Sequence, residues 1–258
     1  MAFEIKSMAL GGTLREAPWL LTVIALAGMT LTSRSACQAP TNANSLVQDG
    51  QRQLDEGRST LEVSTLSTAR GLFEECVRRN RNNSVCFYGL ARTALYLARA
   101  EEAQKDKDSA KKWRDTSITD VRHAIELNDR MADAHALLAD LYGAKITGML
   151  SGIQFGPKAN AEIQRAFQLD PGNAQAFAVV GRKYLYAPRG FGGDLDKAID
   201  SFRKAVALDP RKDENFVWLA IAYRKKGDSE SAKAAISEAL QLNSRSVFAL
   251  RVNSGATE

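Results

Sequence analysis

The residue types that most often bind metals or act as nucleophiles, histidine and cysteine, are scarce in this sequence. The two histidines, His123 and His135, both lie in apolar helical patterns where a packing role is expected. The cysteines are Cys37, Cys76 and Cys86, and their spacing does not match that of a zinc site. No HExxH or GxSxG motif occurs. We therefore expect no metal site, no cofactor and no enzymatic activity.

Charge patterning argues against nucleic-acid binding. The chain of 258 residues has 35 Lys and Arg against 30 Asp and Glu, which gives a formal net charge of +5. The two signs are interspersed along the chain, whereas nucleic-acid-binding proteins group their positive charges. With 45% hydrophobic residues and 6 prolines, the composition is typical of a folded, helix-rich protein.

The N-terminal segment differs in kind from the rest of the chain. Residues 19–32 form an uncharged run that is too short for a membrane-spanning helix, which needs about 20 apolar residues. Such a run suits the apolar core of a signal peptide. We predict that residues 1–36 are a leader removed on export, with translation starting at Met1 or Met8. A leader that stays uncleaved would instead tether a cytoplasmic regulator.

Cys37 stands directly after the predicted leader, in a placement that resembles that of the lipid-carrying cysteine of a bacterial lipoprotein. Arg34 departs from that motif, which has an apolar residue three positions before the cysteine. The sequence therefore predicts an exported protein, either periplasmic or lipid-anchored. Membrane attachment would run through Cys37 or through an uncleaved leader.

The rest of the chain repeats one helical pattern. Near its end, apolar residues fall at helical spacing in two blocks separated by Gly227 and Asp228, a helix stop followed by a capping residue. The same two-block unit recurs upstream, and the phrase "LDP" ends the second block twice, at Pro171 and at Pro210. Each unit is therefore predicted to be two helices joined by a turn.

The spacing of these units resembles that of the tetratricopeptide repeat. Equivalent leucines of the last unit, Leu208 and Leu242, are 34 residues apart, which is the period of that family. The resemblance covers residues 45–243. It implies an all-α, right-handed superhelical solenoid of about five helix-turn-helix repeats, with a linker at 37–44 before it and a short cap and tail at 244–258 after it.

Three of the predicted units are longer than the compact last one, and the extra residues fall between the first and second helices. Insertions at that position emerge on one edge of a stacked array, which is often where binding occurs. Two of them, residues 143–157 and 187–193, are rich in glycine and apolar residues, and we predict loops there. These loops either pack locally as a small core or form a wall for a partner. The wall candidates are Met149, Phe155, Arg189 and Phe191.

A disulfide is predicted between Cys76 and Cys86. Cys76 takes the small-residue position late in the second helix of the first unit, and Cys86 begins the next helix. In a stacked array those two helix ends are neighbours across a short turn, so their Cα atoms can approach within the roughly 7 Å that a disulfide tolerates. The bond would require an oxidising compartment, which agrees with export.

Two glycine-rich stretches, "FGPKANAEIQRAFQLDPGNAQAF" and "APRGFGGDLDKAIDSFRKAVALDP", are similar to those of a group of exported bacterial repeat proteins. They are also similar, more distantly, to the tetratricopeptide subunit associated with TRAP-type solute transporters. The resemblance implies a periplasmic, lipid-anchored helical protein. It implies no chemistry, because the distinctive residues are structural glycines and prolines.

The function that these features favour is a non-catalytic scaffold of the cell envelope that binds a protein or peptide. Its concave surface, lined by the first helices, would form an open polar groove. The residues predicted on that face are Arg92, Asp140, Lys183, Tyr186 and Arg224. The alternative is a ligand-binding accessory subunit of a solute transport system, which would use the insertions as the walls of a closed apolar cavity.

Overall fold

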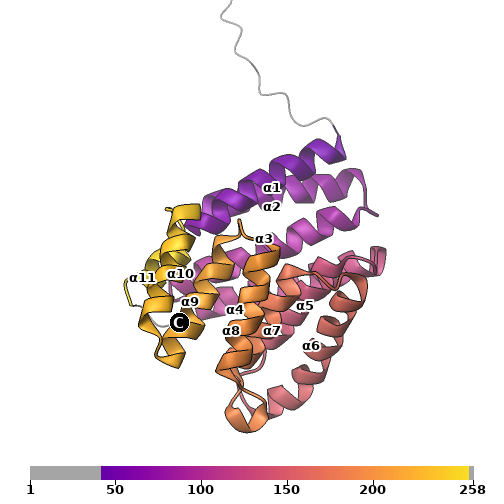
Figure 1. Ribbon diagram of the computed structural model, residues 1–258. Helices are drawn as coiled ribbons and strands as arrows, with labels where there is room; N and C mark the ends of the chain where they lie inside the picture. The colour runs from indigo at the N-terminus through magenta and orange to yellow at the C-terminus, as the bar shows by residue number, and fades with distance from the viewer. Residues whose placement is uncertain (1–41, 256–258) are drawn as a thin grey trace, which may run out of the picture. The chain divides into compact units, whose positions relative to one another are not determined.

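A computed structural model describes residues 42–255, and every regular element in that range is helical (Figure 1). The elements are α1 (Ala43–Thr60), α2 (Val63–Arg79), α3 (Ser84–Ala103), α4 (Lys107–Leu127), α5 (Ala132–Ala144), α6 (Met149–Leu169), α7 (Ala174–Tyr186), the short 3-10 helix η1 (Arg189–Phe191), α8 (Leu195–Leu208), α9 (Asp213–Lys226), α10 (Ser229–Leu242) and α11 (Val247–Asn253). None of the described helices combines the length and the apolarity that crossing a membrane requires. The predicted leader, the start at Met1 or Met8, and Cys37 lie outside the described residues.

Ten of the helices form five consecutive pairs, from α1 with α2 to α9 with α10, and α11 packs on the last pair. Each pair is one helix-turn-helix unit, and the units stack in chain order. The predicted all-α solenoid of five units is therefore confirmed. The turn predicted in the last unit is also confirmed, because Gly227 has φ 90° and the side chain of Asp228 accepts a hydrogen bond from the Ser231 N–H at 3.0 Å.

Glycines allow neighbouring helices to cross closely. A Cβ atom on Gly89 would overlap the ring of Phe73, and one on Gly181 would lie 2.6 Å from the ring of Phe202. Both rings are fully buried. These glycines face large side chains across a helix crossing, so the small-residue pattern in the sequence marks packing positions.

In the second and third units the extra residues lengthen helices rather than forming loops. The loop predicted at 143–157 is wrong, because α6 begins at Met149 and continues for 21 residues, whereas its partner α5 has 13. Ser151 stabilises the start of α6: its hydroxyl accepts a hydrogen bond from the Gly148 N–H at 3.0 Å. The glycines and Pro157 suggested a loop, but the backbone of a helix satisfies most of its own hydrogen bonds, and the contact of Phe155 with Tyr142 supports this part of α6. Residues 187–193 do form a short connection that contains η1.

The first and last units of the solenoid contact each other. Arg58 at the end of α1 forms an ion pair with Asp213 at the start of α9, with 2.9 Å between nitrogen and oxygen. The amide of Asn243, which follows α10, donates to the Ser59 hydroxyl at 2.8 Å. In Figure 1 the last helices, in yellow, lie beside one end of α1 and α2. The described helices therefore close on themselves instead of ending in two free faces.

Candidate functional site

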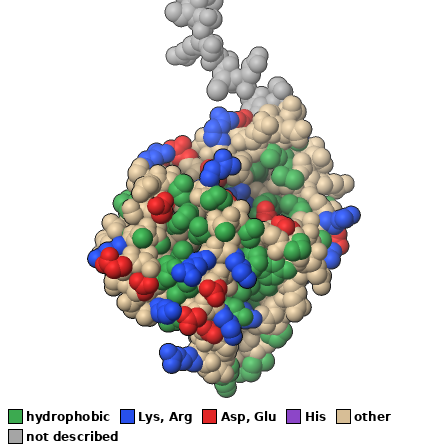
Figure 2. Space-filling model, viewed as in Figure 1, with side chains coloured by type: hydrophobic (Ala, Val, Ile, Leu, Met, Phe, Trp, Pro, Cys, Tyr) green, Lys and Arg blue, Asp and Glu red, His purple; other side chains and the backbone are tan. Residues whose placement is uncertain are grey.

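A small cavity lies on the inner side of the solenoid, between the first helices of four successive units, α3, α5, α7 and α9. Water-molecule centres fit in about 40 Å³ of it, which is room for roughly three waters at about 10–15 Å³ each. Figure 2 shows the viewed face hollowed near its centre, with Lys or Arg side chains beside the hollow. The charged residues that line the cavity are Arg92, Arg99, Asp140, Arg182, Lys212 and Glu214.

Side chains of the protein itself cross this inner space. The Tyr96 hydroxyl on α3 donates to the Glu214 carboxylate on α9 at 2.9 Å, and Arg99 on α3 pairs with the same carboxylate at 3.1 Å. Arg182 on α7 donates to Asp140 on α5 at 2.9 Å. An extended peptide would have to lie where these bonds run. The inner cavity is therefore not the open groove that was expected on the concave side.

Glu214 is the electrostatic centre of these contacts. Burial opposes its ionisation, but the positive charges of Arg99, Lys212 and Arg58 more than offset that cost and hold the pKa of Glu214 at about 2. Burial raises the pKa of Tyr96, and the Glu214 charge acts in the same direction, so the phenol keeps the proton that it donates. The bond between α3 and α9 is thus a charge-assisted hydrogen bond between two buried side chains.

Two of the five residues predicted on the concave face, Arg92 and Asp140, line the inner cavity. Lys183, Tyr186 and Arg224 are not part of that lining, and all three are exposed. The prediction selected polar residues on the first helices by sequence alone, and two of the five line the cavity while three are exposed outside its lining. One of these three, Tyr186, packs edge-on against Trp218 of the lining, with 6.2 Å between ring centroids.

The insertions instead create a row of exposed apolar side chains, which we call the apolar edge and define as Met149, Leu150 and Ile153 on α6 with Phe191 in the α7–α8 connection. Their exposed fractions are 68%, 83%, 69% and 73%. All four lie where a first helix passes to a second one, and Figure 1 shows the start of α6 and the α7–α8 connection at the same end of the stacked helices. The alternative of a local packed core is wrong for these four side chains.

The two remaining wall candidates lie next to the apolar edge in sequence. Phe155 is half-buried and stacks on Tyr142 of α5, with 6.0 Å between ring centroids. The Lys158 ammonium lies 5.6 Å from the centroid of the Phe155 ring. Arg189 is exposed in η1. Phe155 therefore anchors the overhanging part of α6, while Lys158 and Arg189 place positive charge near the exposed apolar residues.

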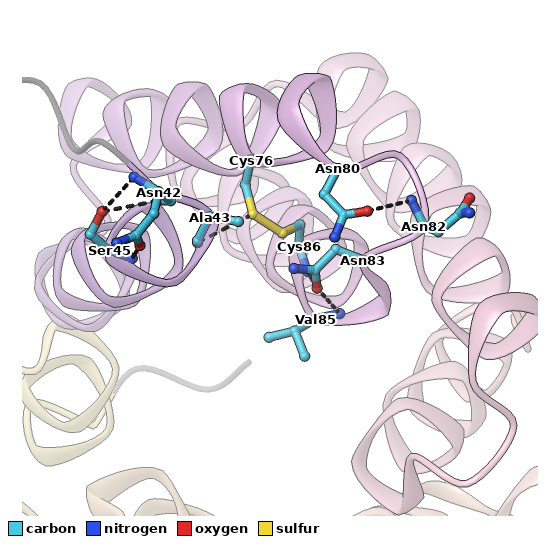
Figure 3. Close-up of a disulfide and its surroundings, with 9 residues drawn as sticks. All are labelled: Asn42, Ala43, Ser45, Cys76, Asn80, Asn82, Asn83, Val85 and Cys86. Carbon is cyan, nitrogen blue, oxygen red and sulfur yellow. Dashed lines mark hydrogen bonds between the residues drawn. A yellow bond between two sulfur atoms is a disulfide. The ribbon is translucent and has the colours of Figure 1, made fainter.

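The disulfide site lies at the other end of the chain, between the first and second units. Cys76 near the end of α2 and Cys86 near the start of α3 are joined through their sulfurs, with 5.9 Å between Cα atoms (Figure 3). Asn83 positions the second cysteine, because its side chain caps α3 by accepting from the N–H groups of Val85 at 3.0 Å and Cys86 at 3.3 Å. Both cysteines are fully buried. The pair therefore staples two repeats together.

The histidines make structural contacts. The two ring nitrogens of His135 lie 2.6 Å from the Glu162 carboxylate and 3.0 Å from the Asp129 carbonyl oxygen. The His123 ring packs edge-on against Phe87, with 4.3 Å between centroids. Residues 42–255 contain no group of three or more His, Cys, Asp or Glu side chains that could hold a metal ion. Both rings therefore link neighbouring elements.

Comparison with known proteins now places the fold. The family model described as "Tetratricopeptide repeat" matches residues 191–212 and 214–246. The chain is therefore similar to that family over these two segments. They comprise the fourth unit's second helix and the whole of the fifth unit, and the upstream units share the same helix-pair architecture. No curated protein sequence matches the chain.

Solved structures agree on the tetratricopeptide-repeat architecture. A thermophilic TPR protein of Thermus thermophilus is 21% identical with a TM-score of 0.59, over 80% of this chain and 98% of that one. The Cut9–Hcn1 hetero-tetramer of the APC/C contains a chain that is 18% identical with a TM-score of 0.51, over 83% of this chain and 38% of that one. At these identities the likeness concerns the fold alone.

Of the residues that line the inner cavity, sequence reasoning selected only Arg92 and Asp140, and Lys212 and Trp218 are among those that it missed. The sequence did contain a signal that could have identified Lys212. The residue before the first helix is asparagine in three units, Asn42, Asn83 and Asn173, and each caps its helix with its side chain. In the last unit Lys212 takes that position and forms no side-chain cap. A basic residue at a capping position is a local departure with no structural benefit to α9.

Proposed function

We propose that this protein is a non-catalytic scaffold that binds a protein partner through the apolar edge. The observation that carries the proposal is the exposure of Met149, Leu150 and Ile153 at the start of one helix. Folded proteins seldom leave such a cluster in water unless it contacts something else. The tetratricopeptide repeats support the proposal, because stacked helical repeats commonly serve as binding surfaces.

The geometry of α6 suits a partner with an apolar helix or strand. The helix exceeds α5 by eight residues (21 against 13), which is about 12 Å of additional length at about 1.5 Å per residue. A side chain on a helix is held more firmly than one on a loop, so the edge is presented ready for contact. Lys158 and Arg189 favour a partner with acidic residues at the rim of its apolar face.

The test is the double variant Leu150→Asp with Ile153→Asp. The matched control is Leu208→Asp with Leu242→Asp, two leucines that are 47% and 42% exposed away from the edge. Both variants should keep wild-type helicity and melting temperature. A partner crosslinked to the wild type and the control in native cells should be lost from the edge variant. A partner that stays bound to the edge variant would refute the proposal, as would edge-dependent dimers in sedimentation or edge-dependent binding to vesicles.

We place this scaffold in the cell envelope, and two features support that location. The buried Cys76–Cys86 pair suits an oxidising compartment, and residues 19–32 have the character of a signal peptide core. Mass spectrometry of the natively produced protein tests the location. A mature chain that begins near Cys37 is expected, with added lipid mass if the protein is anchored. An intact start at Met1 or Met8 would contradict export with cleavage.

The alternative, an accessory subunit of a solute transporter, depends on an enclosed apolar cavity between the insertions. Within residues 42–255 the inner cavity is lined by six charged side chains and lies between the first helices rather than between the insertions. No observation in the described structure favours the transport role over the scaffold.

A further inference from the structure

The inner cavity carries more positive than negative charge. Among the described residues, four basic side chains from three different elements line it, against two carboxylates. We propose that this cavity binds a tetrahedral oxyanion, phosphate or sulfate, which is a function separate from partner binding at the apolar edge. The basic residues are Arg92 and Arg99 on α3, Arg182 on α7, and Lys212 directly before α9.

The two carboxylates that line the cavity are already engaged. Asp140 accepts from the Arg182 Nε at 2.9 Å, and Glu214 pairs with Arg99 at 3.1 Å. The Lys212 ammonium forms no hydrogen bond or ion pair with any of the described residues, although the residue is partly buried. An ammonium group placed this way loses hydration without forming a direct ion pair, because the nearby Glu214 carboxylate is already paired with Arg99.

Arg92, the other basic residue without a lining carboxylate, is held by neutral groups. One of its guanidinium nitrogens donates to the Gln51 side-chain oxygen at 2.7 Å, and the guanidinium lies 5.8 Å from the centroid of the Tyr88 ring. Its distance to the Asp55 carboxylate is 4.0 Å, at the limit of an ion pair. The lining therefore has two positive charges, those of Lys212 and Arg92, that form no ion pair with a carboxylate of the cavity. An anion inside the cavity would balance them.

An independent observation concerns Trp218, which also lines the cavity. Its indole N–H is buried and has no hydrogen-bond partner in the described structure. Buried N–H groups are nearly always bonded, and an unpaired one calls for an acceptor that the protein does not supply. An oxyanion presents acceptors in several directions, so one ion can serve the indole N–H, the ammonium and a guanidinium together.

The electrostatics of Lys212 point the same way. Burial lowers the pKa of its amine, and the charges of Arg92 and Arg182 lower it further, while Glu214 acts in the opposite direction. A bound anion would restore the usual basicity of the amine. The space suits a compact ion, since it has room for roughly three waters and not for a peptide.

The experiment is calorimetric titration of the full chain with inorganic phosphate at fixed ionic strength. The wild type should bind one phosphate per chain with a saturable heat, and sulfate should compete while acetate should not. Lys212→Met should weaken binding at least tenfold while the protein stays folded, because the substitution removes a poorly compensated charge. Lys233→Met is the control, since that side chain is 75% exposed on α10; its affinity should be unchanged.

A second variant keeps the proposal testable if Lys212→Met fails to fold. Trp218→Phe preserves the aromatic packing on Phe202 and Phe248 but removes the indole donor, so phosphate affinity should fall severalfold. Wild-type protein that gives no saturable heat with phosphate or sulfate would overturn the proposal. Equal affinity of the wild type and the Lys212→Met or Trp218→Phe variant would also overturn it, and so would equally strong competition by acetate.

Discussion

Replacing Glu214 by glutamine tests how the second and last units are held together. The substitution keeps the size of the side chain and a group that can accept from Tyr96, but it removes the negative charge that Arg99 faces at 3.1 Å. The pKa of Glu214 is lowered from 4.5 to about 2 in the folded protein. At about 1.36 kcal/mol per pKa unit, that shift corresponds to about 3 kcal/mol of folding stability. The side chain is 11% exposed, so solvent screens this contribution little.

The sign of the pH dependence follows from the direction of the shift. A carboxyl group whose pKa is lowered on folding stabilises the protein above its unfolded pKa and loses that contribution as the pH falls through the folded value. The wild type should therefore lose about 3 kcal/mol of this contribution as the pH falls from 4.5 towards 2. Glu214→Gln should lack it at every pH. The difference in unfolding free energy between the variant and the wild type should therefore be largest at pH 7 and should shrink steadily as the pH falls.

Urea denaturation followed by circular dichroism, in buffers free of phosphate and sulfate, measures both effects. The matched control is Glu230→Gln, since that carboxylate is 89% exposed and pairs with Lys233 at 3.2 Å on the surface. A surface pair of this kind contributes about 0–1 kcal/mol. The reasoning is refuted if Glu214→Gln unfolds within about 1 kcal/mol of the wild type at pH 7, or if the difference between them does not narrow in acid.

Two further predictions concern the helix contacts. Replacing both Cys76 and Cys86 by alanine should cost about 2–3 kcal/mol of unfolding free energy, because the bond closes a loop of ten residues in the unfolded chain. Reductant should lower the urea midpoint of the wild type towards that of the variant, and an unchanged midpoint would contradict the staple. Gly181→Ala should destabilise by about 1–3 kcal/mol, because its Cβ would lie 2.6 Å from the Phe202 ring. Gly71→Ala, which meets nothing within 4 Å on α2, should instead stabilise by about 0.5–1 kcal/mol, and similar melting temperatures for the two would show that the close crossing is not rigid.

The sequence was sufficient to predict the repeat because each unit is specified locally. Ala198, Phe202 and Ala205 are spaced as one face of a helix, and all three are fully buried in α8. The Gly227–Asp228 turn was equally readable, because a glycine stop and an aspartate cap are local signals. Where one unit contacts only its neighbours, a pattern of a few residues is enough to predict its two helices and the turn between them.

The contact between the two ends of the solenoid could not be predicted from the sequence in the same way. It depends on the small rotation between successive units, and that rotation accumulates from the second unit to the fifth before Glu214 meets Tyr96. No short sequence pattern indicates the total rotation along the solenoid. For the same reason the sequence did not predict the inner cavity, because Lys212 and Trp218 line it together with residues of α3 and α7, which are distant in sequence. The loop prediction at 143–157 failed for a different reason, because glycine and proline were weighed above the ability of α6 to continue.

The contacts that close the solenoid also determine when in folding the protein can become stable. A stack of repeats usually folds through near neighbours in sequence, which makes folding fast and gradual. Here Ser59 bonds to a residue 184 positions later and Tyr96 to one 118 positions later. These contacts carry a loop-closure cost that must be met before they stabilise anything. A chain still on the ribosome has α1 and α2 without their final partner, so full protection of the first unit waits for the synthesis of the last.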